Sequence, residues 1–486
     1  MPSGILPLWR FLITDLAGAG ITLLDHLASE RMVTLKLNDA AEVTGTVPSD
    51  SNYVNRLHTD GFPLLAEGVR QLYCFRRESE TPPYYTVRAS TLVMQINDAA
   101  ASDDARSRFT AWDPWQYMMM RPCRMGALTT TPADAGKLVS AAGAKYDDTV
   151  TAAEIAQDLI DAAILYADPS APTAAQNLFL RTISDDGCST TFALNADGWA
   201  YKVDQGTSLG QALQDLCATG YIDIVLTPVY DSTNPGALCD LKIWSQAVAN
   251  SSCDGLGAGV YNYNAIFAWD MPGRSVTGVD DLFDGLGRAN RVQFYNGQGG
   301  PAVAIQDDAT SIATYGEYWA QQFFPSRQDD PSPVVAMAEQ QLWLRKNYKQ
   351  TLTINPAPTR APDPFVDYGL GDRVPVYASD RVRQSLGPYT TAAVNALNSA
   401  TVNVASTAQF PDPTIGAASF VLNGKDVTYT GKTATSFTGC GSHDATVSGD
   451  LVGVRAWQRI YGVPVEIDDN STETVRELLV GVVGAP

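Results

Sequence analysis

The segment Met32-Val33-Thr34-Leu35-Lys36-Leu37 decides the fold class of this chain, because its apolar and polar residues alternate at period two. Side chains at that period lie on one face of a β-strand, so one face is buried and the other is polar. The turn pair Asn38-Asp39 follows, and a second strand is expected at residues 42–47. Antiparallel β-structure is therefore predicted at the start of the chain.

The same pattern extends through the first 125 residues. Short alternating runs recur there, separated by turn residues such as Ala17-Gly18-Ala19-Gly20. The further strands are expected at residues 9–14, 21–24, 71–75 and 84–96. Short strands at this spacing are typical of a small barrel or sandwich.

The pattern changes at Thr151-Ala152-Ala153-Glu154, which is a capping box. Apolar residues on one helical face follow it: Ile155, Leu159, Ile160, Ala163 and Ile164. Ser208 and Gln211 repeat the signal before a second helix that should end at Gly220. With a buried strand at 221–226, these elements predict an α/β unit over about residues 129–250.

The later part combines strands with one long helix. Ser332-Pro333 places a capping residue before a proline, which is favoured at the first helical position, and the helix should run to about Lys346. Strands are expected at residues 348–354, 373–377, 460–467 and 475–482.

A stretch from about Gln384 to Trp457 differs in composition, because it is rich in Thr, Ser, Ala, Asn and Gly and poor in charge. It could be a disordered linker. However, Ala400-Thr401-Val402-Asn403-Val404 and Asp426-Val427-Thr428-Tyr429-Thr430 alternate at period two, which favours a folded β module inserted into a host domain. If so, its two ends should lie close together, with the flanking strands paired in one barrel.

Composition excludes several classes of protein. The formal net charge is −20, so a surface that holds nucleic acid is not expected. Neither a secretory signal in the first ten residues nor a run of 18 apolar residues is found, so no leader or membrane span is expected. Seven scattered cysteines predict mostly buried, reduced thiols, although Cys188–Cys217 or Cys239–Cys253 could pair; the others are Cys74, Cys123 and Cys440.

Residues that carry chemistry are sparse, so no catalytic, cofactor-binding or metal-binding residue is predicted. The chain has only three histidines, His26, His58 and His443, each expected at the surface, and it lacks the HExxH motif. Gly431-Lys432-Thr433 resembles the end of a phosphate-binding loop, but position 426 is Asp where glycine is required. Adjacent acids are expected to be loop charges, although calcium at one pair is possible: 103–104, 147–148, 185–186, 280–281, 307–308 and 329–330.

Several local patterns, in order along nearly the whole chain, resemble the hub-type minor tail proteins of siphophages, especially phages of actinobacteria. The opening strands and the helix after Thr151 are two of them. The others are Ala289-Asn290-Arg291-Val292, Phe365-Val366-Asp367-Tyr368-Gly369-Leu370-Gly371-Asp372-Arg373-Val374, Arg459-Ile460-Tyr461-Gly462-Val463 and Glu473-Thr474-Val475-Arg476-Glu477-Leu478. The inserted stretch departs from the shortest members of this family.

The resemblance implies a mainly β fold similar to the baseplate hub of contractile phages. Two tube-like β-barrels would flank an α/β domain, with a small inserted β module. The expected domains are 1–128 (first barrel), 129–250 (α/β), 251–383 plus 458–486 (second barrel with helix) and 384–457 (module). Three copies would give six similar barrels, which adapt a sixfold tail tube to a threefold tip.

The resemblance also implies a non-enzymatic structural protein of the virion tail tip, made in the host cytoplasm. Its expected partners are its own copies in a homotrimer, the tail tube or distal tail protein, and tip, fibre or tape-measure proteins. DNA would pass through the channel without specific binding. Two alternatives stay open: a tail-associated cell-wall hydrolase, and a host receptor- or glycan-binding tip protein with residues 384–457 as its binding module.

Overall fold

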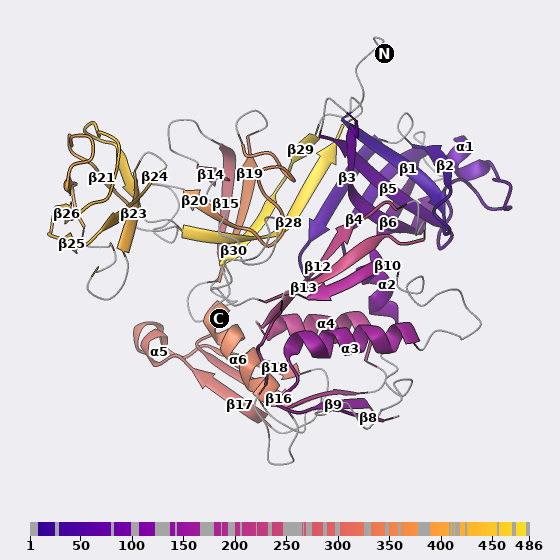
Figure 1. Cartoon of the computed structure of the whole chain (residues 1–486), viewed down its shortest axis with the longest axis horizontal. Coiled ribbons are helices and arrows are strands. Elements are labelled where there is room, and N and C mark those ends of the chain that lie inside the picture. Colours follow the sequence, from indigo (N-terminus) through magenta and orange to yellow (C-terminus); the bar gives the residue numbers. More distant parts are fainter. Residues whose placement is uncertain are drawn as a thin grey trace, which may run out of the picture.

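The computed structural model of the chain has a mainly β fold with an α/β portion, as the sequence predicts (Figure 1). The structure describes residues 8–24, 29–78, 82–98, 106–121, 137–140, 143–165, 179–185, 187–192, 200–204, 207–219, 221–231, 236–245, 265, 267–268, 275–284, 289–296, 302–324, 332–345, 349–357, 361–377, 389–407, 410, 413, 418–422, 425–453, 456–468 and 473–482.

The N-terminal half is antiparallel β-structure. It consists of β1 (Trp9–Asp15), β2 (Gly20–Leu23), β3 (Ser29–Lys36), β4 (Glu42–Pro48), β5 (Arg70–Arg77), β6 (Tyr85–Asp98) and β7 (Arg106–Trp112), with the short helix α1 (Asn52–Asn55). The alternation in β3 buries Val33, and Asn38 in the following turn has a φ of 57°. The predicted strands of this half are confirmed, while β7 is a strand that the sequence analysis did not predict.

The C-terminal half consists of β14 (Phe267–Ala268), β15 (Val276–Asp284), β19 (Lys349–Pro356), β20 (Arg373–Tyr377), β28 (Ala456–Ile467), β29 (Glu473–Val475) and β30 (Leu478–Val482). The predicted closing strand at 475–482 is two strands, because the chain turns between them at Glu477, whose φ is 50°. The expected start of β19 at Tyr348 lies outside the described residues.

The strands of the N-terminal and C-terminal halves are consecutive parts of one 14-stranded sheet, and the division into two barrels stays a prediction. The order of this sheet is β15-β19-β30-β28-β3-β4-β7-β6-β5-β1-β2, with β14, β20 and β29 attached beside this path. The halves meet where β3 pairs with β28, from Lys36 opposite Gly462 to Arg31 opposite Ile467. One apolar core runs through both, and it holds Trp9, Phe11 and Val33 together with Val463 and Val465.

An α/β layer lies beneath this sheet (Figure 1). Two helices, α3 (Ala152–Leu165) and α4 (Leu209–Ala218), are accompanied by α2 (Pro114–Met120) and the strands β8 (Lys137–Ser140), β9 (Gly143–Tyr146), β10 (Leu180–Asp185), β11 (Tyr201–Asp204), β12 (Ile222–Pro228) and β13 (Cys239–Ser245). The capping box is confirmed: Thr151 N donates to Glu154 Oε2 at 2.7 Å, and Glu154 N donates to Thr151 Oγ1 at 3.1 Å. Ser208 caps α4 through Gln211 N at 3.2 Å, and the predicted helix end at Gly220 lies outside the described residues.

A separate three-stranded sheet is formed by β16 (Arg291–Asn296), β17 (Ala302–Asp307) and β18 (Trp319–Phe324), with α5 (Ala309–Tyr315) and α6 (Ser332–Arg345). Helix α6 begins at the predicted Ser332, and its expected end at Lys346 lies outside the described residues. Val292, Phe294, Val334 and Ala338 pack in the same core as α3 and α4. Part of the range 251–383 therefore contacts the α/β layer, and the four-domain division stays a prediction.

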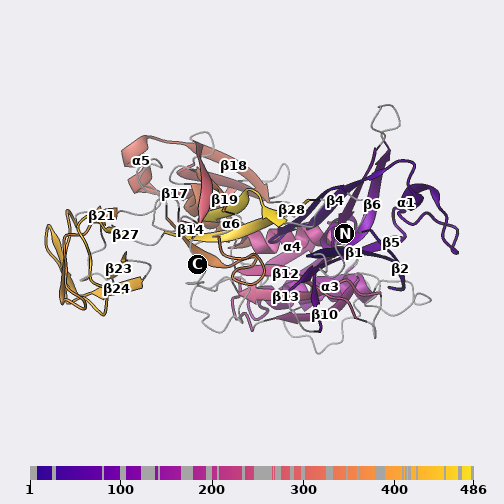
Figure 2. The same cartoon turned by 90° about the horizontal axis from the view of Figure 1, so that it is seen from above.

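The inserted module is a separate β unit at one end of the molecule (Figures 1 and 2). Its strands are β21 (Tyr389–Thr391), β22 (Thr401–Asn403), β23 (Ala418–Leu422), β24 (Lys425–Tyr429), β25 (Gly431–Lys432), β26 (Ser436–Thr438) and β27 (Leu451–Gly453). They enclose their own core, which includes Val402, Phe420, Val427 and Phe437. The alternating segments in this stretch therefore form a folded unit, as predicted.

Candidate functional site

A buried cluster of charged side chains lies at the junction between the N-terminal and C-terminal halves. Arg76 of β5 is 4% exposed and donates from Nε to Glu473 Oε2 at 2.9 Å and from Nη2 to Glu473 Oε1 at 2.5 Å. Its Nη2 also donates to Asp363 Oδ1 at 2.6 Å, and Trp9 Nε1 donates to Glu473 Oε2 at 2.9 Å. Arg76 and Trp9 come from the first hundred residues and their partners from the last 130, so this cluster joins the two halves.

The electrostatics of this cluster favour the charged state of its arginine. Burial lowers the pKa of Arg76, but Glu473 and Asp363 raise it more, so that the pKa lies above its ordinary value. Burial raises the pKa of Asp363, against the opposite effect of Arg76. The ring of Phe365 contacts the guanidinium groups of Arg76 and Arg88, whose carbons lie 5.9 and 5.3 Å from the ring centre.

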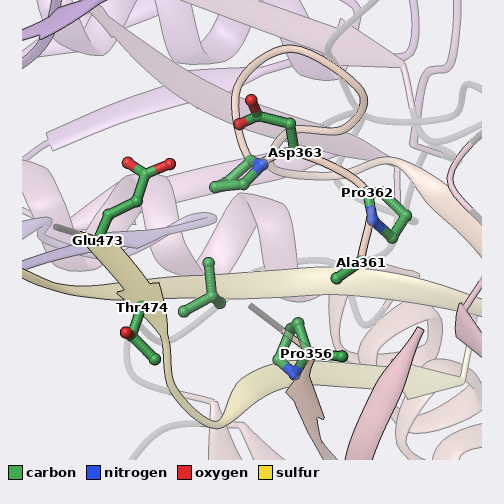
Figure 3. A pocket seen from close by; sticks show the side chains of 9 residues that line it. Pro356, Ala361, Pro362, Asp363, Glu473 and Thr474 are labelled. Carbon is green, nitrogen blue, oxygen red and sulfur yellow. The ribbon is translucent and has the colours of Figure 1, made fainter. Parts of the chain in front are cut away.

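A small open pocket of about 200 Å³ lies beside this cluster (Figure 3). Its walls are mostly proline and other apolar side chains, and its polar groups are two carboxylates and a threonine: Pro356, Ala357, Ala361, Pro362, Asp363, Pro364, Glu473, Thr474 and Val475. Both carboxylates are already bonded to Arg76. The carboxylates of the pocket therefore serve as ion-pair partners that join the two halves.

A second junction joins three parts of the chain. Asp223 of β12 is fully buried and forms an ion pair with Arg459 of β28, which is 3% exposed. Asn38, in the turn after β3, donates from Nδ2 to Asp223 Oδ1 at 2.6 Å and accepts from Ile224 N at 2.8 Å. One buried carboxylate thus fixes the α/β layer against both halves of the long sheet.

The inserted module is attached to the rest of the molecule, here called the body, through two paired strands of the body. Strand β20 pairs antiparallel with β28, from Arg373 opposite Arg459 to Val376 opposite Ala456. Within the module, Tyr389 lies opposite Gly453. The predicted pairing of the flanking strands is confirmed, although the expected start at Gln384 lies outside the described residues. The expected end at Trp457 falls inside β28, because Trp457 pairs with Pro375.

The two histidines that the structure describes, His58 and His443, have separate structural surroundings. His443 is 2% exposed, so the expectation of a surface position is wrong for it. Its Nδ1 and Nε2 lie 2.7 and 2.9 Å from the carbonyl oxygens of Asp444 and Ser399, so it stabilises loops inside the module. His58 is half-buried with its Nδ1 3.6 Å from Asp60 Oδ1, and His26 lies outside the described residues.

The lysine of Gly431-Lys432-Thr433 has a structural role. The segment lies in and beside the short strand β25, and Lys432 Nζ donates to the carbonyl oxygens of Phe410 at 2.6 Å and Thr407 at 3.4 Å. A helix N-terminus, which a phosphate-binding loop requires, does not follow it.

The acidic pairs within the described residues serve local structure. Asp147 accepts from Thr149 N at 2.8 Å, Asp185 accepts from Gly187 N at 2.7 Å, and Asp308 caps α5 through Ser311 N at 2.8 Å. Asp103, Asp104, Asp186, Asp329 and Asp330 lie outside the described residues, and of Asp280 and Asp281 the structure describes only the backbone in β15. Within the described residues, no group of three or more His, Cys, Asp or Glu side chains is arranged to hold a metal ion.

The described cysteines are free thiols, as predicted. Cys74, Cys188, Cys217 and Cys239 are buried and Cys440 is half-buried. Burial raises the pKa of Cys74, Cys217 and Cys239 above the ordinary thiol value. Cys188 and Cys217 form no bridge, while Cys123 and Cys253 lie outside the described residues.

The residues that hold the two junctions were not singled out from the sequence. Arg76 carried a signal, because it continues the inward series of Leu72 and Cys74 in β5, and an arginine at an inward position needs a buried partner. Its partner Glu473, about 400 residues later in the chain, carried no such signal in the sequence. The described part of the chain contains no helix long and apolar enough to span a membrane.

No protein-family model matches the chain, and no curated protein matches its sequence. Solved structures do match it over nearly its whole length. A tail protein from Neisseria meningitidis is similar at 10% identity, covering 97% of this chain and 96% of that one, with a TM-score of 0.49. The 43 kDa tail protein of prophage MuSo2 from Shewanella oneidensis is similar at 11% identity, covering 98% of both chains, with a TM-score of 0.45.

A component of the type VI secretion system from E. coli, described as structurally similar to bacteriophage T4 tail proteins, is similar at 8% identity. The match covers 95% of this chain and 74% of that one, with a TM-score of 0.38. The structural neighbours named here are thus two tail proteins and a component of a secretion system.

Proposed function

We propose that this chain is a structural hub protein of a siphophage tail tip. Three copies form a ring that joins the sixfold tail tube to the threefold tip, continues the DNA channel and anchors tip or receptor-binding proteins. In this proposal the protein is part of the virion, acts in host attachment and DNA ejection, and is not an enzyme.

The observation that carries the proposal is the construction of the long sheet. Each chain contributes two antiparallel β halves of similar size, which are fixed to each other by β3–β28 pairing, a shared core and the Arg76–Glu473 ion pair. Two rigidly joined halves per chain supply six similar positions in a trimer. A ring of six positions made from three chains has the symmetry that an adaptor between a tube and a tip requires.

Three further features agree with this role. The net charge of −20 suits a channel through which DNA passes without being held. The inserted module has its own core and projects from the body, and in this proposal it contacts a tip or fibre protein. The buried Asp223–Arg459 ion pair keeps the α/β layer in one orientation against the sheet, as a load-transmitting part requires.

The direct test is cryo-electron microscopy of the assembled particle. We expect three copies of this chain in a ring between the tail tube and the tip, with the two halves alternating around the channel. Native mass spectrometry of the purified chain with its tail-tube neighbour should give a trimer. A sixfold or twofold arrangement of this chain in the particle would overturn the proposal.

A further inference from the structure

The outer face of the β17-β16-β18 sheet is an exposed surface that the hub role does not use. Helix α6 packs against the other face, where Val292 and Phe294 are buried. Alternation puts the odd-numbered residues outward, and three of these have about half of their surface exposed: Ile305 at 55%, Trp319 at 50% and Phe323 at 53%. Aromatic side chains of this exposure on one sheet face are typical of a binding surface.

The register of the strands arranges this face in rows. Arg291 lies between Asp307 and Trp319, Gln293 lies between Ile305 and Gln321, and Tyr295 lies beside Phe323. Trp319 and Phe323 are four residues apart in β18, so their positions are about 13 Å apart along the strand.

The two aromatic rings on β18 present open faces in the same direction. The guanidinium carbon of Arg291 lies 4.9 Å from the centre of the Trp319 ring, and Tyr295 stacks on Phe323 with ring centres 5.0 Å apart. Both covering residues belong to β16. The uncovered faces of the Trp319 and Phe323 rings are therefore turned away from β16. Gln321 lies between these two residues in β18.

The polar groups of this face favour an uncharged ligand. Arg291 is the one cation within the three strands, and it is neutralised by Asp307, at 2.6 and 2.8 Å, and by Glu317, at 2.9 Å. Phosphate groups and acidic peptides would find no free cation within these strands. The side-chain amides of Gln293 and Gln321 have no hydrogen-bond partner among the described residues, so each can donate and accept.

We propose that this face binds a neutral polysaccharide. The apolar faces of two sugar units stack on Trp319 and Phe323, and the hydroxyl groups of the chain between them bond to Gln321. The ligand is an oligosaccharide rather than a single sugar, because it must reach both rings. The inserted module is the less suitable glycan site, since its described aromatic residues are buried in its own core: Phe410, Phe420, Tyr429 and Phe437.

The test is isothermal titration of the full-length protein with two neutral probes, chitohexaose and cellohexaose. We expect the wild type to bind at least one of them. Trp319→Ala and Phe323→Ala should each weaken that binding by about tenfold, and Gln321→Ala by a smaller factor. Trp319→Phe should restore most of the loss, because it keeps an aromatic ring.

Phe62→Ala is the matched control, since Phe62 is an aromatic residue of similar exposure (47%) in the N-terminal half. It should leave binding unchanged. The proposal is overturned if the wild type binds neither probe, or if binding survives in the Trp319→Ala/Phe323→Ala double variant. A double variant that loses ring assembly while the wild type ignores both sugars would identify the face as a protein interface instead.

Discussion

The body and the inserted module bury different kinds of polar group. The body encloses five arginines, each at most 4% exposed, namely Arg31, Arg70, Arg76, Arg373 and Arg459. The buried polar side chains described in the module are uncharged hydroxyls and amides, apart from one histidine, and they are Thr390, Asn395, Thr407, Ser436, His443 and Thr446. The body therefore uses charge where the module uses neutral hydrogen bonds.

The difference follows from the distances in sequence that the contacts span. The ion pairs of the body join residues as remote as Arg76 and Glu473, whereas the hydrogen bonds and strand pairs of the module join residues within about 65 positions of each other. A buried ion pair adds little net stability, but a mispaired arrangement would leave a charge buried alone. Charge thus selects one pairing of remote segments, and the module does not need that selection because its contacts are local.

The largest expected effect is at the three-way junction. Asp223→Ala leaves Arg459 buried without its carboxylate, which should lower the free energy of unfolding of the body by about 3–5 kcal/mol. Urea unfolding of the full chain measures it. Glu466→Gln, which removes an exposed ion pair with Arg476, is the control and should cost at most about 1 kcal/mol. Equal effects of the two variants would contradict the role given to the junction.

A pH dependence should distinguish the body from the module. Burial raises the pKa of both Asp113 and Asp215 to about 7, against smaller opposite effects of their hydrogen bonds from Trp115 N and Gln211. A carboxyl group with a raised pKa in the folded state stabilises the fold below its unfolded pKa of about 4, and this stability is lost as the pH rises through 7. The free energy of unfolding of the body should fall by on the order of 3 kcal/mol for each of these two groups between pH 4 and pH 8.

Asp113→Asn and Asp215→Asn should flatten that profile, because an amide does not ionise. The described side chains of the module include no buried carboxylate, so its unfolding should depend little on pH in the same range. Circular dichroism during urea unfolding at several pH values measures the unfolding of the body and of the module separately. A body profile that stays steep in the double variant would rule out these two groups as its cause.

A neutral network should control the module alone. Asn395, 6% exposed, donates to Thr446 Oγ1 at 2.8 Å and to the carbonyl oxygen of Ala393 at 2.9 Å, and it accepts from Asn403 N at 2.8 Å. Asn395→Ala should destabilise the module by about 2 kcal/mol and leave the body unchanged. Val394→Ala, at a neighbouring position with 73% exposure, should change neither. Calorimetry resolves the two transitions; a shift in both would contradict the independence of the module.

The smallest effect on the body is expected from removing the module. Replacing residues 384–453 with a short Gly-Ser turn keeps Ala456 and Trp457 in β28, where they pair with β20. Loop length changes the free energy of closure by only about 0.6 kcal/mol per doubling. The shortened chain should fold, bury the same long sheet and join the tail, as judged by its melting temperature and by particle assembly. An insoluble product would mean that the module completes the core of the body.

Local elements could be predicted because their signals are short. The capping box at Thr151, the Ser332-Pro333 helix start and the alternation at Met32 all predicted the element that is found. Helix α2 carried a similar signal, with Asp113 as its cap and Pro114 in its first turn, and it was missed. The inward series Ser107, Phe109 and Ala111 could likewise have revealed β7.

Long-range pairing could not be predicted in the same way. The alternation of β3 shows that one of its faces is buried, but it does not say which strand lies at its edge, since backbone hydrogen bonds are independent of sequence. The contact between α6 and the α/β core depends on the same kind of information. The two junctions and the exposed rings of β18 could therefore be recognised only from the three-dimensional structure.

The pairing of β3 with β28 has a consequence for biosynthesis. The N-terminal half cannot complete its edge until β28, some four hundred residues later, has left the ribosome. At about 5–20 residues per second, β3 keeps an open edge for tens of seconds. An open strand edge invites pairing with another nascent chain. A polysome that makes this protein therefore carries several unfinished sheets at once, and a chaperone that covers β3 until β28 emerges should raise its yield.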